Sequence, residues 1–384
     1  MTRTLLAFTA AIFAWSTAVC AADASRARDL GIPFDGTPGE WNAITDVAGV
    51  TVGFHTQIGE SEAGAAIRTG VTAILPRGVD SALKPVPAGI FSLNGNGELT
   101  GSHWVEESGL MEGPVMITNT HSVGVVHDAV IAWRVRHGAA DAEGYFWSLP
   151  VVGETWDGWL NDINGFHVTP EHVFSALDSA GSGPVVEGNV GGGTGMICHQ
   201  FKGGTGTASR VIEIEDTIYS LGVLVQANYG DRDQLRIAGV PVGKHLTKER
   251  AYEDPSEETG SIIIVIATDA PLLPHQLKRV ARRATLGLGR MGSYASDGSG
   301  DIFLAFSTAN PQLNQLDTAT VRALGNGQLS PLFLATVQAT EEAIVNALVA
   351  AETMTGYQGH RAVAIDHDAL REVLKQYGRQ AAPE

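Results

Sequence analysis

Short apolar runs separated by glycine-rich and polar turns dominate the chain, and their periodicity predicts alternating strands and helices. Val115–Thr118 is a short buried-type strand, and residues 123–136 after it have apolar side chains at helical spacing. Val211–Glu215 largely alternates, as a strand with one exposed face does, and Leu221–Ala227 predicts a more buried strand.

The second half of the chain continues this arrangement with longer helices. Pro274 begins a predicted helix whose apolar residues recur three and four positions apart. Asp301–Ser307 predicts a strand, Pro331–Met354 the longest helix and Asp366–Tyr377 a final amphipathic helix. Mixed strands and helices of this kind indicate layered α/β or α+β packing.

The sharpest change of pattern lies between Gly260 and Ser261. Residues 244–260 carry eight charged side chains and predict an exposed loop that proteases can reach. Ser261–Ala267 is apolar and β-branched, which is typical of a strand buried on both faces. A polar loop therefore runs directly into a central strand.

The first residues predict a secretory signal peptide spanning residues 1–22. Arg3 precedes an apolar run of 15 residues, Leu5–Val19, and small residues follow up to Ala22. The run is shorter than the roughly 20 residues that cross a bilayer, and no other segment reaches that length. We expect cleavage near Ala22 and a periplasmic or secreted protein; a buried N-terminal element or a lipoprotein fits less well.

The remaining 362 residues carry 24 basic and 42 acidic side chains, a net charge of −18. This charge argues against nucleic acid and anionic membranes as partners, because neither offers cations, although solubility alone explains it. Cys198 is then the single cysteine, so no intramolecular disulfide is expected. A buried, inert thiol explains it better than a nucleophile does.

A serine at the start of a buried strand gains a base when the peptide bond before it is cut. The freed α-amino group has an ordinary pKa of about 7.7–8.0 and can accept the hydroxyl proton. Gly260 has no Cβ and therefore permits close attack by the Ser261 hydroxyl on the preceding carbonyl. Local sequence alone still favours an ordinary Gly-Ser turn over self-cleavage.

A loop of small residues, 291–301, supplies a hydroxyl and a carboxylate. Ser299 and Asp301 are two positions apart at the start of a predicted strand, so they point the same way and could hold a third group such as Ser261. Without context, Asp-Gly-Ser-Gly-Asp is more often a polar turn or a cation-binding loop.

Six segments carry a resemblance that extends over almost the whole mature chain: Arg26–Gly31, Trp41–Val50, Asn94–Gly101, Gly188–Gly195, Gln226–Gly230, and Gly260–Ser261 with residues 267–272. In this order they resemble the DmpA family of L-aminopeptidases/D-esterases, relatives of the β-peptidyl aminopeptidases. The resemblance implies a four-layer α/β/β/α sandwich, similar to N-terminal-nucleophile hydrolases in architecture but with different connectivity.

The resemblance also implies self-cleavage into an α chain, residues 23–260, and a β chain, residues 261–384, which together form one catalytic domain. Ser261 is then the nucleophile, and Ser299 and Asp301 complete its hydrogen-bond network. The corresponding acid is a glutamate in the family. Aspartate is one methylene shorter, so contact of Asp301 with Ser299 or the substrate amine is the weakest of these expectations. A homotetramer of αβ units without a cofactor is implied as well.

Three further residues match positions of the family's site. Asn228 matches the oxyanion-hole asparagine, although a turn asparagine is the simpler interpretation of the local sequence. Tyr145 matches an aromatic residue that lines the site, and Glu154 matches a carboxylate that holds the substrate's free ammonium group. An ordinary packed aromatic and a surface acid are the alternatives; Tyr145 slightly favours an L-aminopeptidase.

Two other binding chemistries find little support. The glycine-rich stretch 188–206 lacks a Gly-Lys-Ser/Thr ending and a βαβ unit, so close backbone approach explains it better than phosphate binding. The 12 histidines show no metal-ligand spacing such as His-Glu-x-x-His, and no metal is expected.

The sequence therefore predicts a self-cleaving serine aminopeptidase that acts through an acyl-Ser261 intermediate. Its expected substrates are short peptides, amides or esters with a free amino terminus. Two alternatives remain: an N-terminal-nucleophile acylase of acyl-amides or β-lactams, and a non-catalytic periplasmic binding protein.

Overall fold

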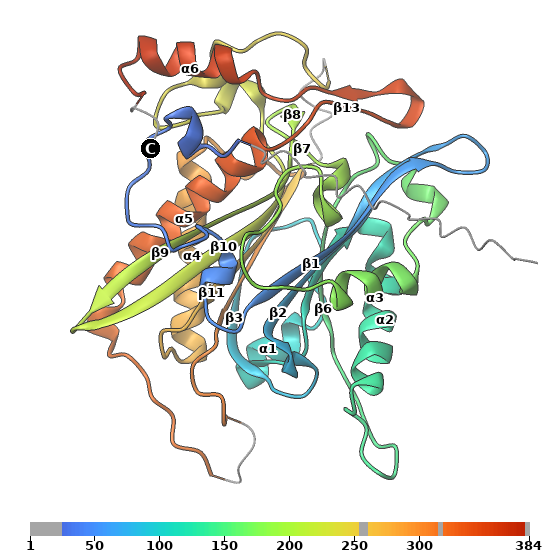
Figure 1. The fold of residues 1–384 in the computed structure, drawn as a ribbon, viewed down its shortest axis with the longest axis vertical. Helices are drawn as coiled ribbons and strands as arrows, with labels where there is room; N and C mark the ends of the chain where they lie inside the picture. Colours follow the sequence, from blue (N-terminus) through green and yellow to red (C-terminus); the bar gives the residue numbers. More distant parts are fainter. Residues whose placement is uncertain (1–24, 253–259, 314–317, 381–384) are drawn as a thin grey trace, which may run out of the picture.

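The computed structural model describes residues 25–252, 260–313 and 318–380 and arranges them in four layers (Figure 1). Two β-sheets pack face to face, and helices cover the outer face of each sheet. The expected α/β/β/α sandwich is therefore confirmed. The predicted signal peptide and residues 253–259 of the predicted polar loop lie outside the described residues.

The larger sheet has six strands in the order β4-β3-β12-β11-β10-β9. Its two central strands run parallel and are buried along their whole length, namely β11 (Ser261–Thr268) and β12 (Gly300–Ser307). The others are β3 (Val86–Gly95), β4 (Leu110–Met111), β9 (Gly204–Ile214) and β10 (Thr217–Asn228).

The smaller sheet has four strands in the order β1-β2-β5-β6. These are β1 (Thr51–Glu60), β2 (Ala66–Val79), β5 (Val115–Asn119) and β6 (Val151–Thr155). Two short hairpins lie outside both sheets: β7 (Ile197–Cys198) with β8 (Phe201–Lys202), and β13 (Met354–Thr355) with β14 (Arg361–Ala362).

Two helices cover each sheet. They are α4 (Pro274–Arg290) and α5 (Ser330–Val349) on the larger sheet, and α2 (Val123–Arg136) and α3 (Pro170–Asp178) on the smaller one. The shorter α1 (Ser102–Ser108) lies against β3 and β4, and α6 (His367–Gln376) begins after Asp366. The Asp366 side chain accepts hydrogen bonds from two backbone N–H groups of the first turn, which caps the helix.

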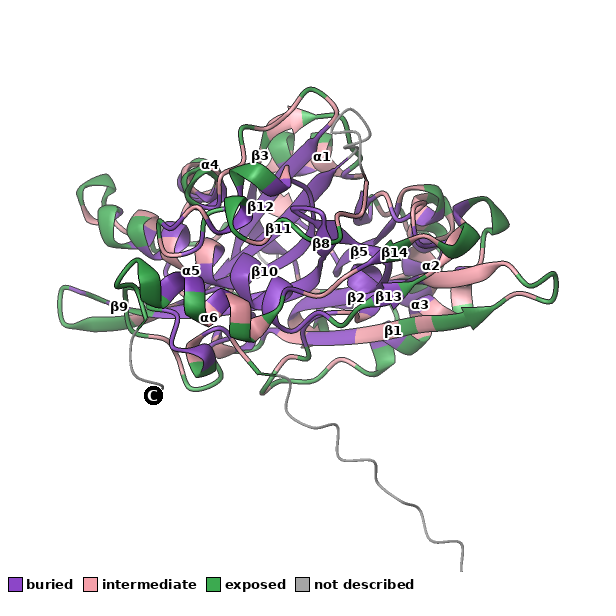
Figure 2. Ribbon diagram, turned by 90° about the horizontal axis from the view of Figure 1, so that it is seen from above, coloured by how far each residue is buried: buried purple, intermediate pink, exposed green. Residues whose placement is uncertain are grey.

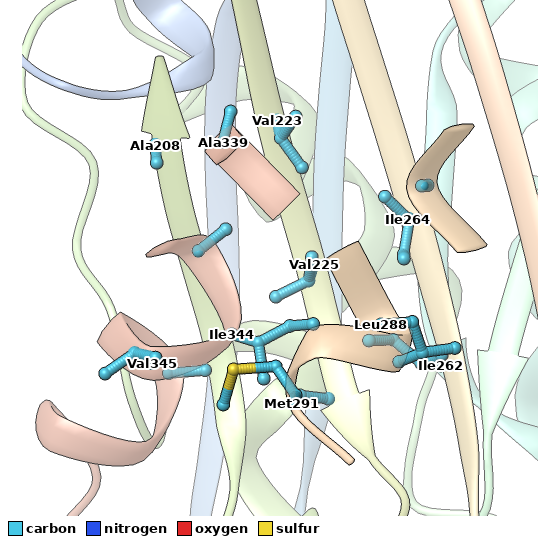
Figure 3. Close-up of a cluster of buried hydrophobic side chains, with 14 of the residues drawn as sticks. Ala208, Val223, Val225, Ile262, Ile264, Leu288, Met291, Ala339, Ile344 and Val345 are labelled. Carbon is cyan, nitrogen blue, oxygen red and sulfur yellow. The ribbon is translucent and has the colours of Figure 1, made fainter. Parts of the chain in front are cut away.

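Three layers of apolar side chains hold the sandwich together, and Figure 2 shows the buried residues along its middle. Alternate residues of β11 enter two of these layers. Ile262 and Ile264 face α4 and α5, where they lie among residues such as Leu288 and Ile344 (Figure 3). Ile263 belongs to the layer between the sheets. This confirms the prediction of a strand buried on both faces.

The elements that the periodic pattern predicted are present, but not all of their ends are correct. The helix predicted over residues 123–136 has those bounds, whereas β9 begins at Gly204, seven residues before the predicted strand at Val211. A Cβ on Gly206 would lie 2.0 Å from the carbonyl oxygen of Ala343 in α5, so glycine is needed for the helix to approach. Its lack of a side chain hides this part of the strand from a hydropathy pattern.

The predicted C-terminal end of α5 is wrong. The helix ends at Val349 and not at Met354, which instead begins β13 and pairs with Ala362. The expectation that no mature segment reaches transmembrane length also needs correction. The stretch Asn326–Val349 has the length and hydropathy of a membrane span, but 78% of its most apolar window is buried inside the protein, as in a core helix.

Candidate active site

Ser261 is the first residue of the central strand β11, and its exposed fraction is 4%. β11 pairs with β10 on one side, where Ser261 lies opposite Asn228, and with β12 on the other, where it lies opposite Gly300. Because side chains alternate along a strand, Ser261 shares the face of Ile263 and points into the space between the sheets. The predicted nucleophile therefore lies at the end of the inter-sheet core.

The Asn228 side chain is fixed by main-chain groups from two other segments. Its Oδ1 accepts a 2.8 Å hydrogen bond from the Ile197 N–H, and its Nδ2 donates a 3.0 Å hydrogen bond to the Trp156 carbonyl. An N–H can bond only to the oxygen of the amide, so the Ile197 contact sets the amide's orientation. These contacts leave one Nδ2 hydrogen, and the Asn228 side chain shares a face of the sheet with Ser261.

Ser299 and Asp301 form a buried pair beside the nucleophile. The Ser299 Oγ donates a 2.6 Å hydrogen bond to Asp301 Oδ1, and the two residues are 2% and 0% exposed. The predicted alignment of the hydroxyl and the carboxylate is confirmed, and the shorter aspartate does reach Ser299. Gly300, which separates them, lies opposite Ser261, so the pair flanks the nucleophile's position on the neighbouring strand. The Asp301 side chain shares the face of Phe303, which is the face of the sheet turned away from the Ser261 side chain.

The peptide before Ser261 fits tightly against β10. A Cβ on Gly260 would lie 2.6 Å from Tyr229 Cα and 2.7 Å from the Asn228 carbonyl oxygen, both of them backbone atoms that cannot easily move. The Gly260 carbonyl accepts a 3.3 Å hydrogen bond from the Gly300 N–H. The carbonyl that Ser261 would attack is thus held in place and polarised by a backbone donor.

Glu154 is a buried carboxylate near the same strand ends. It lies in β6, is 3% exposed and accepts hydrogen bonds from the Glu98 N–H at 2.9 Å and from the Thr120 hydroxyl. A Cβ on Gly97 would lie 3.3 Å from both Glu154 Oε1 and Gly300 Cα, so the carboxylate and the start of β12 both lie next to this glycine. Burial raises the pKa of Glu154. The alternative of a surface acid is therefore wrong.

Tyr145 is not brought to Ser261 within one chain. It lies on the segment between α2 and β6, where its exposed fraction is 72%. Its surroundings are Ala82, Leu83 and the neighbouring Phe146 and Trp147, which line a surface hollow with it. The alternative of a packed aromatic does not describe it either, because most of its ring faces solvent.

The glycine-rich stretch serves close packing. Gly191–Gly195 forms a buried 3-10 turn, and a Cβ on Gly192 would lie 2.1 Å from Gln226 Oε1. The preferred interpretation was close backbone approach near the catalytic asparagine or tight turns, and the stretch shows both a tight turn and a close approach to Gln226. Cys198 is buried, as expected for an inert thiol. Within the described residues no three His, Cys, Asp or Glu side chains are grouped as metal ligands.

Two contributors to the site were not predicted from the sequence. The Trp156 carbonyl and the Ile197 N–H orient Asn228, yet both are main-chain groups that any residue type would supply. Trp156 follows β6 directly, and its neighbour Asp157 is buried, with a hydrogen bond from Asn161 Nδ2 at 3.1 Å. Burial raises the pKa of Asp157 to about 7.

Comparisons with known proteins show the family of the chain. The sequence profile of Peptidase family S58 matches residues 42–362. The chain is 54% identical to the beta-peptidyl aminopeptidase BapA of Sphingosinicella microcystinivorans, over 94% of each chain.

Solved structures show the same fold. The L-aminopeptidase D-Ala-esterase/amidase of Ochrobactrum anthropi, described as a prototype of the serine aminopeptidases and a variant of the Ntn hydrolase fold, superimposes with a TM-score of 0.87. It is 52% identical, and the match covers 93% of this chain and 99% of that one. A beta-aminopeptidase of a Burkholderia species gives a TM-score of 0.86 at 49% identity, covering 92% and 99%.

Proposed function

Since the chain belongs to peptidase family S58 and is a serine-type aminopeptidase, we propose that it activates itself by cutting Gly260–Ser261 and then uses Ser261 as its nucleophile. The observation that carries this proposal is the pairing of Ser261 with Asn228 across β11 and β10. It places a fixed amide donor on the same face as a serine hydroxyl at the end of the central strand.

Self-cleavage begins with attack of the Ser261 hydroxyl on the Gly260 carbonyl carbon, and breakage of the C–N bond leaves an ester and frees the α-amine of Ser261. Water then hydrolyses the ester, which releases the Gly260 carboxylate and restores the Ser261 hydroxyl. The freed amine, with an ordinary pKa of about 7.7–8.0, accepts the hydroxyl proton in each later turnover. The Ser299–Asp301 pair orients the new N-terminus from the neighbouring strand. Water then releases the acyl group from Ser261.

Asn228 supplies the oxyanion contact. Its side chain shares the face of Ser261 and keeps one Nδ2–H for the substrate. The amide is already held by its other two hydrogen bonds, so it needs no rearrangement when charge develops. A preorganised donor of this kind contributes about 2.7–4 kcal/mol to transition-state stabilisation in comparable enzymes.

Glu154 recognises the substrate's free ammonium group. A carboxylate buried beside the reacting strand ends pairs with a cation and rejects an acylated nitrogen, which would leave it unpaired. The substrates are short peptides, amides or esters with a free amino terminus. N-terminal β-amino acids are included, because relatives about half identical to this chain carry the names beta-peptidyl aminopeptidase and beta-aminopeptidase.

The proposal includes export and assembly. Residues 1–22 direct the chain to the periplasm or beyond and are then removed. The mature protein is a homotetramer of αβ units, without a cofactor, nucleic acid or membrane as a partner. Size-exclusion chromatography with light scattering, together with N-terminal sequencing of the secreted protein, tests both parts.

Replacement of the nucleophile tests the central proposal. The active enzyme should run on a denaturing gel as fragments of about 25 and 13 kDa, from 238 and 124 residues of about 105 Da each. Ser261→Ala should run as one band of about 38 kDa and hydrolyse nothing, whereas Ser293→Ala, on a nearby loop, should be cut normally. A processed and active Ser261→Ala variant would disprove the proposal.

Substrate profiling separates this function from that of an acylase. H-β-Ala, H-L-Ala and H-D-Ala p-nitroanilides should be compared with their N-acetylated forms. We expect hydrolysis only with the free amine. Equal rates on the acetylated forms would favour an acyl-amide or β-lactam acylase, and a protein that stays uncut and binds without turnover would be a binding protein.

A further inference from the structure

Lys202 is a fully buried lysine that the proposed mechanism does not use. Its exposed fraction is 0%, and its ammonium group donates to three main-chain carbonyls: Met196 at 2.9 Å, Gly203 at 2.7 Å and Gly193 at 3.4 Å. None of these acceptors is a carboxylate. Burial lowers the pKa of Lys202 to about 7, against a smaller opposing effect of Cys198. Among the described residues no carboxylate pairs with Lys202, and burying a cation in this way is costly, so its retention calls for an explanation.

A single peptide group connects this lysine to the oxyanion donor. The Met196 carbonyl accepts the Lys202 hydrogen bond, and the N–H of the same Met196–Ile197 peptide donates to Asn228 Oδ1 at 2.8 Å. Two amides therefore stand in series between the ammonium group and the free Nδ2–H of Asn228. Hydrogen bonds linked in this way polarise one another, especially where water is excluded.

We propose that Lys202 is a positioning residue that acts through the Met196–Ile197 peptide to orient Asn228 and to strengthen its amide as an oxyanion donor. In its protonated form Lys202 draws electron density toward the Met196 oxygen, which makes the Ile197 N–H a better donor. That stronger bond in turn makes the Asn228 Nδ2–H a better donor toward a developing negative charge. The inference rests on the oxyanion role proposed above for Asn228.

A purely structural role for Lys202 is the competing explanation. The lysine also bonds Gly193 in the buried glycine turn, so its removal will lower stability in either case. A structural anchor would lower activity whether or not Asn228 is present. Action through Asn228 disappears when Asn228 is replaced, and this difference separates the two roles.

The test is a double-mutant cycle on self-cleaved enzyme with H-β-Ala p-nitroanilide. The single variants are Asn228→Ala and Lys202→Met, the double variant combines them, and Lys84→Met serves as an exposed-lysine control. We expect Asn228→Ala to lower kcat by about 10²–10³. Lys202→Met should lower kcat by roughly tenfold with KM within about twofold, but by less than about twofold in the Asn228→Ala background.

The other possible results would overturn either the inference about Lys202 or the proposed oxyanion role of Asn228. Equal losses from Lys202→Met in both backgrounds would overturn the inference and leave the proposed function intact. An unchanged kcat in Asn228→Ala would overturn the proposed oxyanion role, and the inference with it. Where Lys202→Met does not fold or is not cut, Lys202→Gln keeps a neutral donor to the Met196 carbonyl and should show a smaller loss with the same dependence on Asn228.

Discussion

The Ser299 hydroxyl donates a 2.6 Å hydrogen bond to the Asp301 carboxylate, and the pair flanks Gly300, the β12 residue opposite Ser261. An aspartate at this position is therefore long enough to bond Ser299 on the strand next to the nucleophile. Because both side chains are buried, the bond is shielded from water. Hydrogen bonds to a charged group of this kind are worth about 1.5–3 kcal/mol.

Neutralising Asp301 should slow catalysis. Asp301→Asn keeps the size of the side chain but removes its charge, so we expect kcat to fall by about 10- to 100-fold with little change in KM. Asp297→Asn, on the exposed part of the same loop, is the control and should leave kcat unchanged. A wild-type kcat in Asp301→Asn would show that the pair does not support the nucleophile.

A side chain at residue 260 should impede self-cleavage. In Gly260→Ala the new Cβ meets backbone atoms of Tyr229 and Asn228 at 2.6–2.7 Å, so the carbonyl must leave its position beside Ser261. We expect the half-time of cleavage, followed on denaturing gels, to lengthen at least about tenfold, because small misplacements of reacting atoms carry large kinetic costs. Gly289→Ala in α4 meets nothing within 4 Å and should be cut at the normal rate.

Glu154 should set both amine recognition and the acid limb of the pH profile. Glu154→Gln should lower kcat/KM for free-amine substrates by about tenfold or more, because it removes the charge-assisted contact. Burial raises the carboxyl pKa, so in the native enzyme kcat/KM should fall as the pH drops through that raised value.

Removing the Thr120 hydroxyl tests more specifically whether Glu154 sets the acid limb of the pH profile. Its hydrogen bond opposes the rise in the pKa of Glu154. Thr120→Val should therefore move the acid limb to higher pH while kcat/KM at alkaline pH changes little. If the acid limb of the pH profile does not move, a group other than Glu154 sets it.

A buried ion cluster should hold the two predicted chains together. Glu342 of α5 is 0% exposed and pairs with Arg28 and Arg210, both at 2.7 Å and both on the other side of the cut site. Glu342→Ala removes the carboxylate that pairs with the buried Arg210 and should cost about 3–5 kcal/mol of unfolding free energy. The adjacent Glu341→Ala, which removes a partly exposed pair with Arg290, should cost under about 1 kcal/mol.

The unfolding measurement is best made by urea titration of the uncut Ser261→Ala variant, where a single chain allows reversible unfolding. Equal losses for Glu342→Ala and Glu341→Ala would mean that the buried cluster is not a special source of stability.

Asp157 should make stability fall with rising pH. Its pKa is about 7 in the fold and 3.8 ordinarily, so between these values the folded state binds more protons than the unfolded state. Unfolding free energy should therefore decline from about pH 4 to pH 7, by on the order of 4 kcal/mol in total, and then level off. Asp157→Asn, which can still accept the Asn161 hydrogen bond, should remove this decline; exposed Asp178→Asn should not.

The local hydropathy pattern predicted those elements whose burial follows from their own residue types. α2 and β11 are periodic or continuously apolar, and both were located correctly. The strands β1 and β2 mix polar and apolar residues because parts of each are exposed, so a pattern alone did not identify them. The start of β9 contains glycines, which give no hydropathy signal, so the pattern did not predict it. There the close approach of α5 requires glycine.

The sequence by itself determined the junction at Gly260–Ser261 and the adjacency of Ser299 to Asp301, because both depend on neighbouring residues and strand alternation. Only the tertiary structure decided which distant groups meet them. The register of β10 against β11 places Asn228 opposite Ser261, and backbone groups of Trp156 and Ile197 orient it. Main-chain donors and acceptors are the same at almost every residue, so their partners are set by how strands pair and cross and not by residue type.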